Sequence, residues 1–214
     1  AGDAIIDNDD ANGVALQSIN TTGFLQVTSE GPITVETTTT VITVGTTATF
    51  ITNDDAGSAI TIDTLLFTAG GTVTAQALNN AGTAAVDADI RIIELTDTLL
   101  IDQVETAGDA FLESAVDLVD GGDANVDITA DNVALRSREG IGEGNELETA
   151  ISTLAAVNTV SGDLDIDNSV GGLLTIGAVD NVSGVTNTGP DDIIITNGSP
   201  LTVSNNVTAT GDIL

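Results

Sequence analysis

The chain of 214 residues contains no His, Cys, Lys, Met, Trp or Tyr, and its only cations are Arg91, Arg136 and Arg138. These absences exclude an imidazole base, a thiol nucleophile, a Schiff-base lysine, a disulfide, and metal sites built from His or Cys. Only Asp, Glu, Ser, Thr and the three arginines are left for chemistry. We therefore expect a protein that is not an enzyme and that needs no organic cofactor.

Charge is almost entirely of one sign, with 33 acidic residues against 3 basic ones and a formal net charge of −30. A nucleic-acid partner is excluded because phosphate recognition requires clustered Lys and Arg. Repulsion among the carboxylates predicts that stability rises with salt or with millimolar Ca²⁺. Halophilic origin is a second explanation of this composition. No apolar run approaches the roughly 18 residues of a membrane-spanning helix, so no membrane span is expected.

The residues that are abundant predict a folded β protein. Hydrophobic residues make up 41% of the chain and the mean hydropathy is +0.27, which is too apolar for a disordered chain. Val, Ile, Leu and Thr favour strands, whereas clusters of Gly, Asn and Asp favour turns. Short doublets of the form apolar-x-apolar recur roughly every nine residues, as in the steps from Leu16 to Val27, Val35 and Val44. Each doublet predicts a short strand with one buried face.

This rhythm favours a parallel β-helix, in which each rung uses two or three short strands and like residues stack between rungs. Residues 1–214 are expected to form a single β-solenoid array of ten or eleven rungs of about 20 residues, a rod about 50 Å long. An antiparallel sandwich is the alternative, but it favours longer strands and an aromatic core. Asn and Gly are expected at left-handed corner positions.

Two stretches depart from the strand pattern. In residues 145–156, Asn145 and Glu148 have the spacing of a capping box, and the apolar residues follow at helical spacing. This pattern predicts a short amphipathic helix on the flank of the β-helix. Residues 109–119 fit either a helix or a strand.

The segment from Val133 to Leu214 resembles the β-helical repeats of filamentous-haemagglutinin-like proteins, which are very long bacterial adhesins. The resemblance lies in the Gly140-Ile141-Gly142 turn, the expected short helix, the small residues Ala155-Ala156, and the strand that follows Gly162. It implies a right-handed parallel β-helix, exposure on the bacterial surface or secretion, and a scaffold or adhesive role. It implies no catalytic residues.

Three carboxylates are the candidates for a Ca²⁺ site. Asp163, Asp165 and Asp167 alternate with Leu164 and Ile166, which places all three on one outer strand face. Hard oxygen ligands suit Ca²⁺, although a solvated acidic face explains the row as well. Asp7, Asp9 and Asp10 form a second acidic cluster. The glycine-rich segment Gly121–Ile128 is loosely similar to a calcium-binding nonapeptide, with Ala124 in place of a later Gly.

The leading functional hypothesis is a non-catalytic structural or adhesive segment of an extracellular bacterial surface protein or fibre. The alternatives are a carbohydrate- or Ca²⁺-binding surface module, a self-stacking filament or surface-layer subunit, and a β-helix enzyme that cleaves polysaccharide with paired carboxylates. The expected partners are cell-surface glycans and the chain itself. Apolar residues near both ends, Ile5-Ile6 and Ile213-Leu214, predict open rungs that join flanking repeats or stack end to end.

Overall fold

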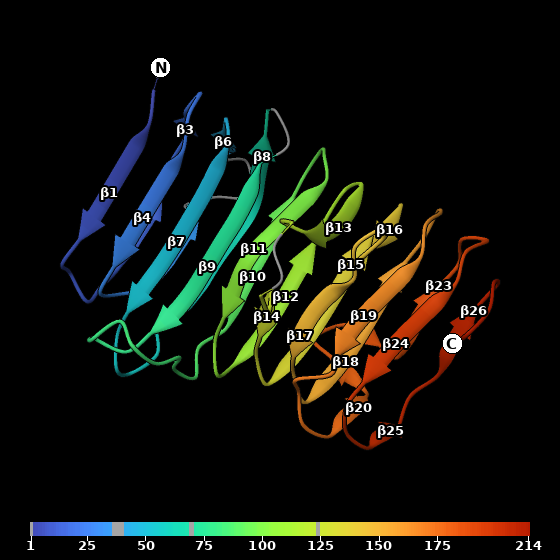
Figure 1. Ribbon diagram of the computed structural model, residues 1–214. Helices are drawn as coiled ribbons and strands as arrows, with labels where there is room; N and C mark the ends of the chain where they lie inside the picture. The colour runs from blue at the N-terminus through green and yellow to red at the C-terminus, as the bar shows by residue number, and fades with distance from the viewer. Residues whose placement is uncertain (1, 36–40, 69–70, 123–124) are drawn as a thin grey trace.

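The computed structural model describes residues 2–35, 41–68, 71–122 and 125–214. Two sheets of parallel strands face each other across one core, and the chain passes from one sheet to the other and back in every turn (Figure 1). The all-β solenoid expected from the sequence is therefore confirmed. None of the described residues forms a helix, so no helix there is long enough to cross a membrane.

The first sheet lies in front in Figure 1 and has eleven strands among the described residues: β1 (Ala4–Asn8), β4 (Leu25–Ser29), β7 (Thr47–Asn53), β9 (Thr72–Leu78), β11 (Leu99–Glu105), β13 (Asp117–Asp120), β14 (Ile128–Thr129), β16 (Gly140–Ile141), β17 (Leu147–Ala150), β19 (Leu164–Asn168) and β24 (Ile193–Asn197). Beyond β11 two turns use a pair of short strands, β13 with β14 and β16 with β17, in place of one long strand.

The second sheet lies behind and has thirteen strands in the same part of the chain: β2 (Val14–Leu16), β3 (Ile19–Asn20), β5 (Ile33–Val35), β6 (Ile42–Val44), β8 (Ile60–Phe67), β10 (Ile90–Glu94), β12 (Asp109–Glu113), β15 (Asn132–Ser137), β18 (Thr153–Asn158), β20 (Leu174–Ile176), β23 (Val185–Asn187), β25 (Leu201–Val203) and β26 (Val207–Ala209). A separate antiparallel hairpin, β21 (Ala178–Val179) with β22 (Val182–Ser183), lies outside both sheets.

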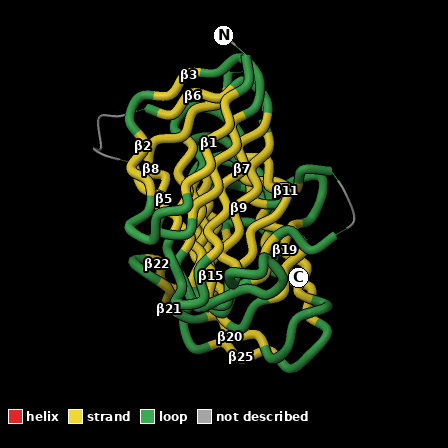
Figure 2. The backbone as a smooth tube through the Cα atoms, turned by 90° about the vertical axis from the view of Figure 1, so that its left-hand side faces the viewer, coloured by secondary structure: helices red, strands yellow, loops and turns green. Residues whose placement is uncertain are grey.

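The coil is right-handed. In Figure 1 the strands of the first sheet run downward in front, those of the second sheet run upward behind, and the chain advances from left to right. The view along the coil in Figure 2 agrees, with the first sheet on the right and the second on the left. Strand twist and the parallel crossover rule favour this hand.

The described strands make nine turns, fewer than the ten or eleven expected, and most of the turns are longer than 20 residues. The partner of Ala4 in the next turn is Leu25, 21 residues on, whereas the partner of Leu164 is Ile193, 29 residues on. The extra residues form excursions such as the β21–β22 hairpin. Nine turns at about 4.8 Å give a rod about 40 Å long, not 50 Å.

The core is a stack of aliphatic ladders. In the second sheet Ile60 pairs with Ile90, and Leu112 pairs with Leu135, and all four side chains are buried. Phe50 is the largest of the fully buried side chains. Parallel register keeps each inward side chain above another one, so every turn buries the apolar face of its neighbours.

The helix predicted over residues 145–156 is wrong. The segment forms β17 and β18, which pair with β14, β15 and β19, and residues 109–119 likewise form β12 and the start of β13. An isolated helix of this length is marginal in water. In the β conformation, the backbone of this segment forms parallel ladder hydrogen bonds with both neighbouring turns. These bonds outweigh the local capping interaction that favours a helix.

Buried asparagines lie at corners of the later turns, but their backbones do not adopt the left-handed conformation that was expected. Among the described residues the only non-glycine with positive φ is Asp180. Instead, the side chain of the fully buried Asn168 donates from Nδ2 to Asn197 Oδ1 at 2.9 Å, and its Oδ1 accepts from the Ile151 amide at 3.0 Å. Asn158 and Asn187 are linked in the same way at 3.3 Å. These asparagines hold neighbouring turns together through side-chain hydrogen bonds.

Candidate functional site

The acidic row predicted from the sequence lies on the first sheet. Asp165 and Asp167 project from the outer face of β19, Asp163 immediately precedes that strand, and all three side chains are half-buried. Asp163 Oδ1 accepts a hydrogen bond from the Asp192 amide at 2.9 Å, and Asp167 Oδ1 accepts one from the Ser169 amide at 2.7 Å. Burial, together with the charges of Glu146, Asp163 and Asp167, raises the pKa of Asp165. Calcium binding by this row stays a prediction.

In the described part of the chain, one group of three acidic side chains converges closely enough to hold a metal ion: Asp120, Asp127 and Glu148. One carboxylate oxygen from each lies within 4.8 Å of the other two. Asp120 ends β13, Asp127 immediately precedes β14, and Glu148 lies in β17. We call these three residues the carboxylate cluster.

Parallel pairing sets the position of the cluster. The β14 residue Ile128 pairs with Thr149 of β17, which places Asp127 beside Glu148. The Glu148 amide donates to Asp127 Oδ2 at 2.9 Å, and the Asp127 amide donates to the Glu148 carbonyl at 2.9 Å. The two carboxylates therefore belong to consecutive turns and are held at ladder spacing by the backbone.

Asp120 is fixed by two donors. The Gly122 amide donates to its Oδ1 at 2.8 Å, and the side-chain amide of Asn145 donates to its Oδ2. The Asp120 side chain is 6% exposed and that of Asp127 is fully buried, whereas Glu148 is half-buried. The cluster is thus covered on the Asp127 side and reaches solvent through Glu148.

The cluster leaves two buried oxygens unpaired. Asp127 Oδ1 and Glu148 Oε2 are both shielded from solvent and have no hydrogen-bond partner. Burial is the main cause that raises the pKa of Asp127 to about 9, and the nearby Asp120 charge contributes in the same direction. Burial also raises the pKa of Glu148. Without a counter-charge, the folded protein holds a proton on Asp127 at neutral pH.

Sequence reasoning missed this cluster, although its parts carried signals. Asp127 lies in the glycine-rich segment Gly121–Ile128 that was compared with a calcium-binding nonapeptide, of which residues 123 and 124 lie outside the described residues. Asn145 and Glu148 were interpreted as a capping box, yet both side chains face the cluster. The second acidic group is unlike it: Asp10 is exposed and accepts two hydrogen bonds from Asn12, which lower its pKa.

The second sheet carries a different arrangement on its outer face. The β21–β22 hairpin, on the left in Figure 2, covers a small apolar cluster that is separate from the core: Phe111, Ala134, Ala155, Val179 and Val182. Phe111, Ala134 and Ala155 are register partners on β12, β15 and β18. Two alanines in this column leave room for the hairpin to approach the sheet.

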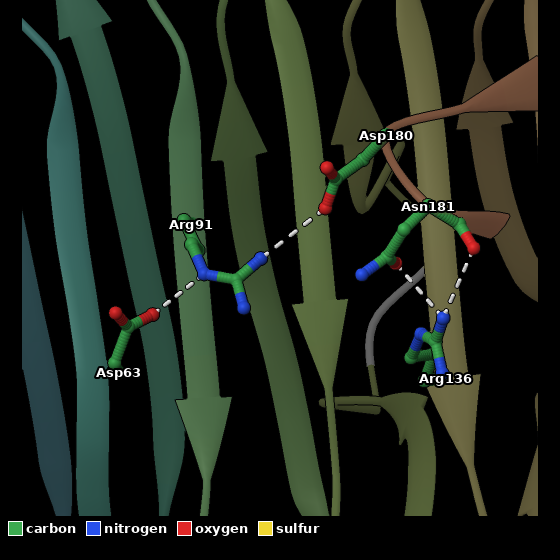
Figure 3. Close-up of polar contacts among 5 residues, drawn as sticks. All are labelled: Asp63, Arg91, Arg136, Asp180 and Asn181. Carbon is green, nitrogen blue, oxygen red and sulfur yellow. Dashed lines mark hydrogen bonds and ion pairs between the residues drawn. The ribbon is translucent and has the colours of Figure 1, made fainter.

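Two of the three arginines hold the hairpin against the second sheet, as Figure 3 shows. Arg91 Nε lies 2.6 Å from Asp63 Oδ1, and Arg91 Nη1 lies 3.5 Å from Asp180 Oδ2 in the hairpin. Its guanidinium carbon is 3.9 Å from the centre of the Phe111 ring. Arg136 Nη2 donates to Asn181 Oδ1 at 2.8 Å. These contacts give both arginines a structural role.

The comparisons with protein families, curated proteins and solved structures find no match for this chain. The β-helical architecture that the resemblance implies is present in the described residues.

Proposed function

We propose that this chain is a structural segment of an extracellular bacterial surface protein or fibre, in which the solenoid acts as a rigid spacer. The observation that carries the proposal is the parallel pairing that continues through both large sheets of the described residues around one aliphatic core. Such a rod resists bending because each turn is hydrogen-bonded along its length to the turns beside it. The resemblance of Val133–Leu214 to adhesin repeats and the high acidity support the location.

The last turn supports end-to-end assembly. Leu201 is 47% exposed and Val203 is 57% exposed, although their register partners one turn earlier, Leu174 and Ile176, are fully buried. These two residues, with Ile195, Val207, Leu214 and others, line a hollow of about 520 Å³. A further turn stacked in the same strand direction would cover them as β25 covers β20, and this turn can come from flanking repeats of the same chain or from a second copy. Between copies such a contact is heterologous and extends into a filament.

Sedimentation velocity on the full chain tests this assembly. We expect association that grows with concentration, and a shift to the 21.4 kDa monomer when Leu201→Asp and Val203→Asp are combined. Val170→Asp is the matched control, because Val170 is 67% exposed but does not line the hollow. A wild-type chain that stays monodisperse at 21.4 kDa would contradict end-to-end stacking. Turnover of an acidic polysaccharide that is lost on mutating a carboxylate pair would contradict the spacer role itself.

Glycan binding is the alternative function, and one observation favours it. A hollow of about 300 Å³ beside the second sheet is lined by Arg136 and Arg138, and Arg136 Nε is a buried donor without a partner. In a chain of net charge −30, two neighbouring guanidinium groups suit a carboxylated or sulfated sugar. A glycan array with wild type and Arg138→Gln tests this function. Saturable binding of acidic glycans that the variant loses would support it over an inert spacer.

A further inference from the structure

We propose that Asp120, Asp127 and Glu148 bind one Ca²⁺ ion, which joins two consecutive turns of the solenoid. The site is independent of the spacer role and differs from the Asp163–Asp167 row. It combines three converging carboxylates with a fully buried Asp127 whose Oδ1 has no hydrogen-bond partner. An acidic cluster alone is common on a protein surface, but a buried and unpaired carboxylate oxygen inside it requires a counter-charge or a proton.

The unpaired oxygens are the ones available to an ion. Both oxygens of Asp120 accept hydrogen bonds, and Oδ2 of Asp127 accepts one from the Glu148 amide. Asp127 Oδ1 and Glu148 Oε2 remain without partners. The hydrogen bonds therefore orient the carboxylates, while one oxygen from each of the three residues lies within 4.8 Å of the other two. This division between fixed and free oxygens is what preorganised metal ligation needs.

The ligand chemistry selects a hard cation. All the candidate ligand atoms are carboxylate oxygens, and His and Cys are absent from the chain. Such oxygens favour Ca²⁺ and Mg²⁺ over softer metals. One oxygen from each residue lies within 4.8 Å of the other two, which is close enough for all three to contact one ion. Ca²⁺ accepts irregular oxygen geometry, whereas Mg²⁺ demands a near-ideal octahedron and keeps most of its water, so three carboxylates fixed by the backbone favour Ca²⁺.

The position of the cluster indicates which strands a bound ion would join. Asp120 and Asp127 flank the segment that joins β13 to β14, and Glu148 comes from β17 of the following turn. One ion held by all three joins the end of β13 and the start of β14 to β17 of the next turn. It also neutralises charge where Glu146, Asp163 and Asp165 add to the negative potential of the same face. The ion would thus cross-link two consecutive turns in the part of the first sheet where each turn contributes two short strands.

Isothermal titration calorimetry with CaCl₂ on the chelator-treated full chain is the direct test. We expect one saturable site in wild type and affinity at least 10-fold weaker in Asp127→Asn and in Glu148→Gln. Asp165→Asn is the matched control, since it removes a half-buried carboxylate from the same face outside the cluster and should bind within about twofold of wild type. MgCl₂ in place of CaCl₂ should bind at least 10-fold more weakly. Circular dichroism establishes that each variant is folded.

Two outcomes would overturn the proposal. The first is wild type that takes up no more Ca²⁺ than Asp127→Asn while both are folded, which would leave a shared proton as the counter-charge in the cluster. The second is an equal loss of binding in Asp165→Asn, which would show diffuse ion accumulation on the acidic face. A melting temperature that rises with Ca²⁺ in wild type, at ionic strength held constant with NaCl, and does not rise in Asp127→Asn would support the site.

Discussion

The two outer faces of the solenoid enclose the same kind of core but differ in what lies on them. The face of the first sheet carries mostly polar side chains, with a few aliphatic ones such as Ile51 and Ile194, and its outward carboxylates include Asp7, Asp102, Glu105, Asp165 and Asp167. The face of the second sheet carries a second apolar cluster, a covering hairpin and two of the three arginines. Inward residues therefore specify the coil, whereas outward residues give each face its own chemistry.

The largest difference between the faces should appear when a large outward side chain is truncated. We expect Phe111→Ala to lower the free energy of unfolding by about 3 kcal/mol, because the ring is buried beneath the hairpin and stacks on Arg91. Thr49→Ala on the outer face of the first sheet should change it by less than about 0.5 kcal/mol. Urea denaturation of both variants measures the difference. Equal effects would mean that the hairpin adds no packing of its own.

A larger side chain in place of an alanine beneath the β21–β22 hairpin should weaken the packing of the hairpin on the second sheet. Ala155→Leu places a larger side chain where β21 and β22 pack, and we expect a loss of about 2 kcal/mol in stability. Hydrogen exchange should rise for residues 178–183 while the core strands stay protected. Thr74→Leu on the open face of the first sheet provides the contrast and should leave exchange unchanged. Protection of the hairpin in Ala155→Leu would contradict the packing described.

A smaller effect is expected from the ion pairs that hold the hairpin. Arg91→Gln removes the contacts with Asp63 and Asp180 and the stacking on Phe111. Because the side chains of Arg91, Asp63 and Asp180 are each at least one-third exposed to solvent, the loss should be about 1 kcal/mol and should shrink at high salt. Thermal melts of wild type and variant at low and high NaCl measure it. A loss that is independent of salt would assign the effect to packing alone.

Much of the fold was predictable because apolar alternation and turn residues act locally. The predicted doublets from Val14/Leu16 to Leu201/Val203 lie on strands, except that Val126 of the doublet Val126/Ile128 precedes β14. The parallel solenoid follows from their short spacing. The number of turns was not predictable, since nothing in the rhythm distinguishes a corner from an excursion such as residues 178–183. The helix prediction at 145–156 was wrong because pairing with two neighbouring turns is a long-range property.

The candidate site was less predictable than the fold. Asp163, Asp165 and Asp167 are adjacent in sequence and were easy to find, but one strand cannot make their carboxylates converge. Asp127 and Glu148 meet only because β14 and β17 are in register, 21 residues apart. The sequence also suggested a local role for Glu148 as a helix-capping residue. That interpretation gave no reason to expect its contact with Asp127 of the preceding turn. Sites built across turns become visible only when the register is known.

The pH dependence of stability follows from carboxylates whose pKa the fold shifts. The pKa is lowered by hydrogen bonds for Asp10 and Asp54, and it is raised, chiefly by burial, for Glu94, Asp117, Asp127, Glu143, Glu148 and Asp165. A raised folded-state pKa means that the native state keeps a proton that the unfolded chain has lost. The resulting stabilisation is complete below the unfolded pKa and is lost as pH rises through the folded pKa. For Asp127 this window extends from 3.8 to about 9.

The most direct measurement is the melting temperature of wild type and Asp127→Asn between pH 8 and pH 5, with a chelator present and constant ionic strength. The wild-type melting temperature should rise as the pH falls, because the native state binds more protons than the unfolded chain throughout this pH range. Asp127→Asn should show a clearly flatter dependence, since it removes the group with the largest window. A wild-type melting temperature that stays level or falls on acidification, or a variant with the same slope, would contradict a buried and unpaired carboxylate at the centre of the acidic face.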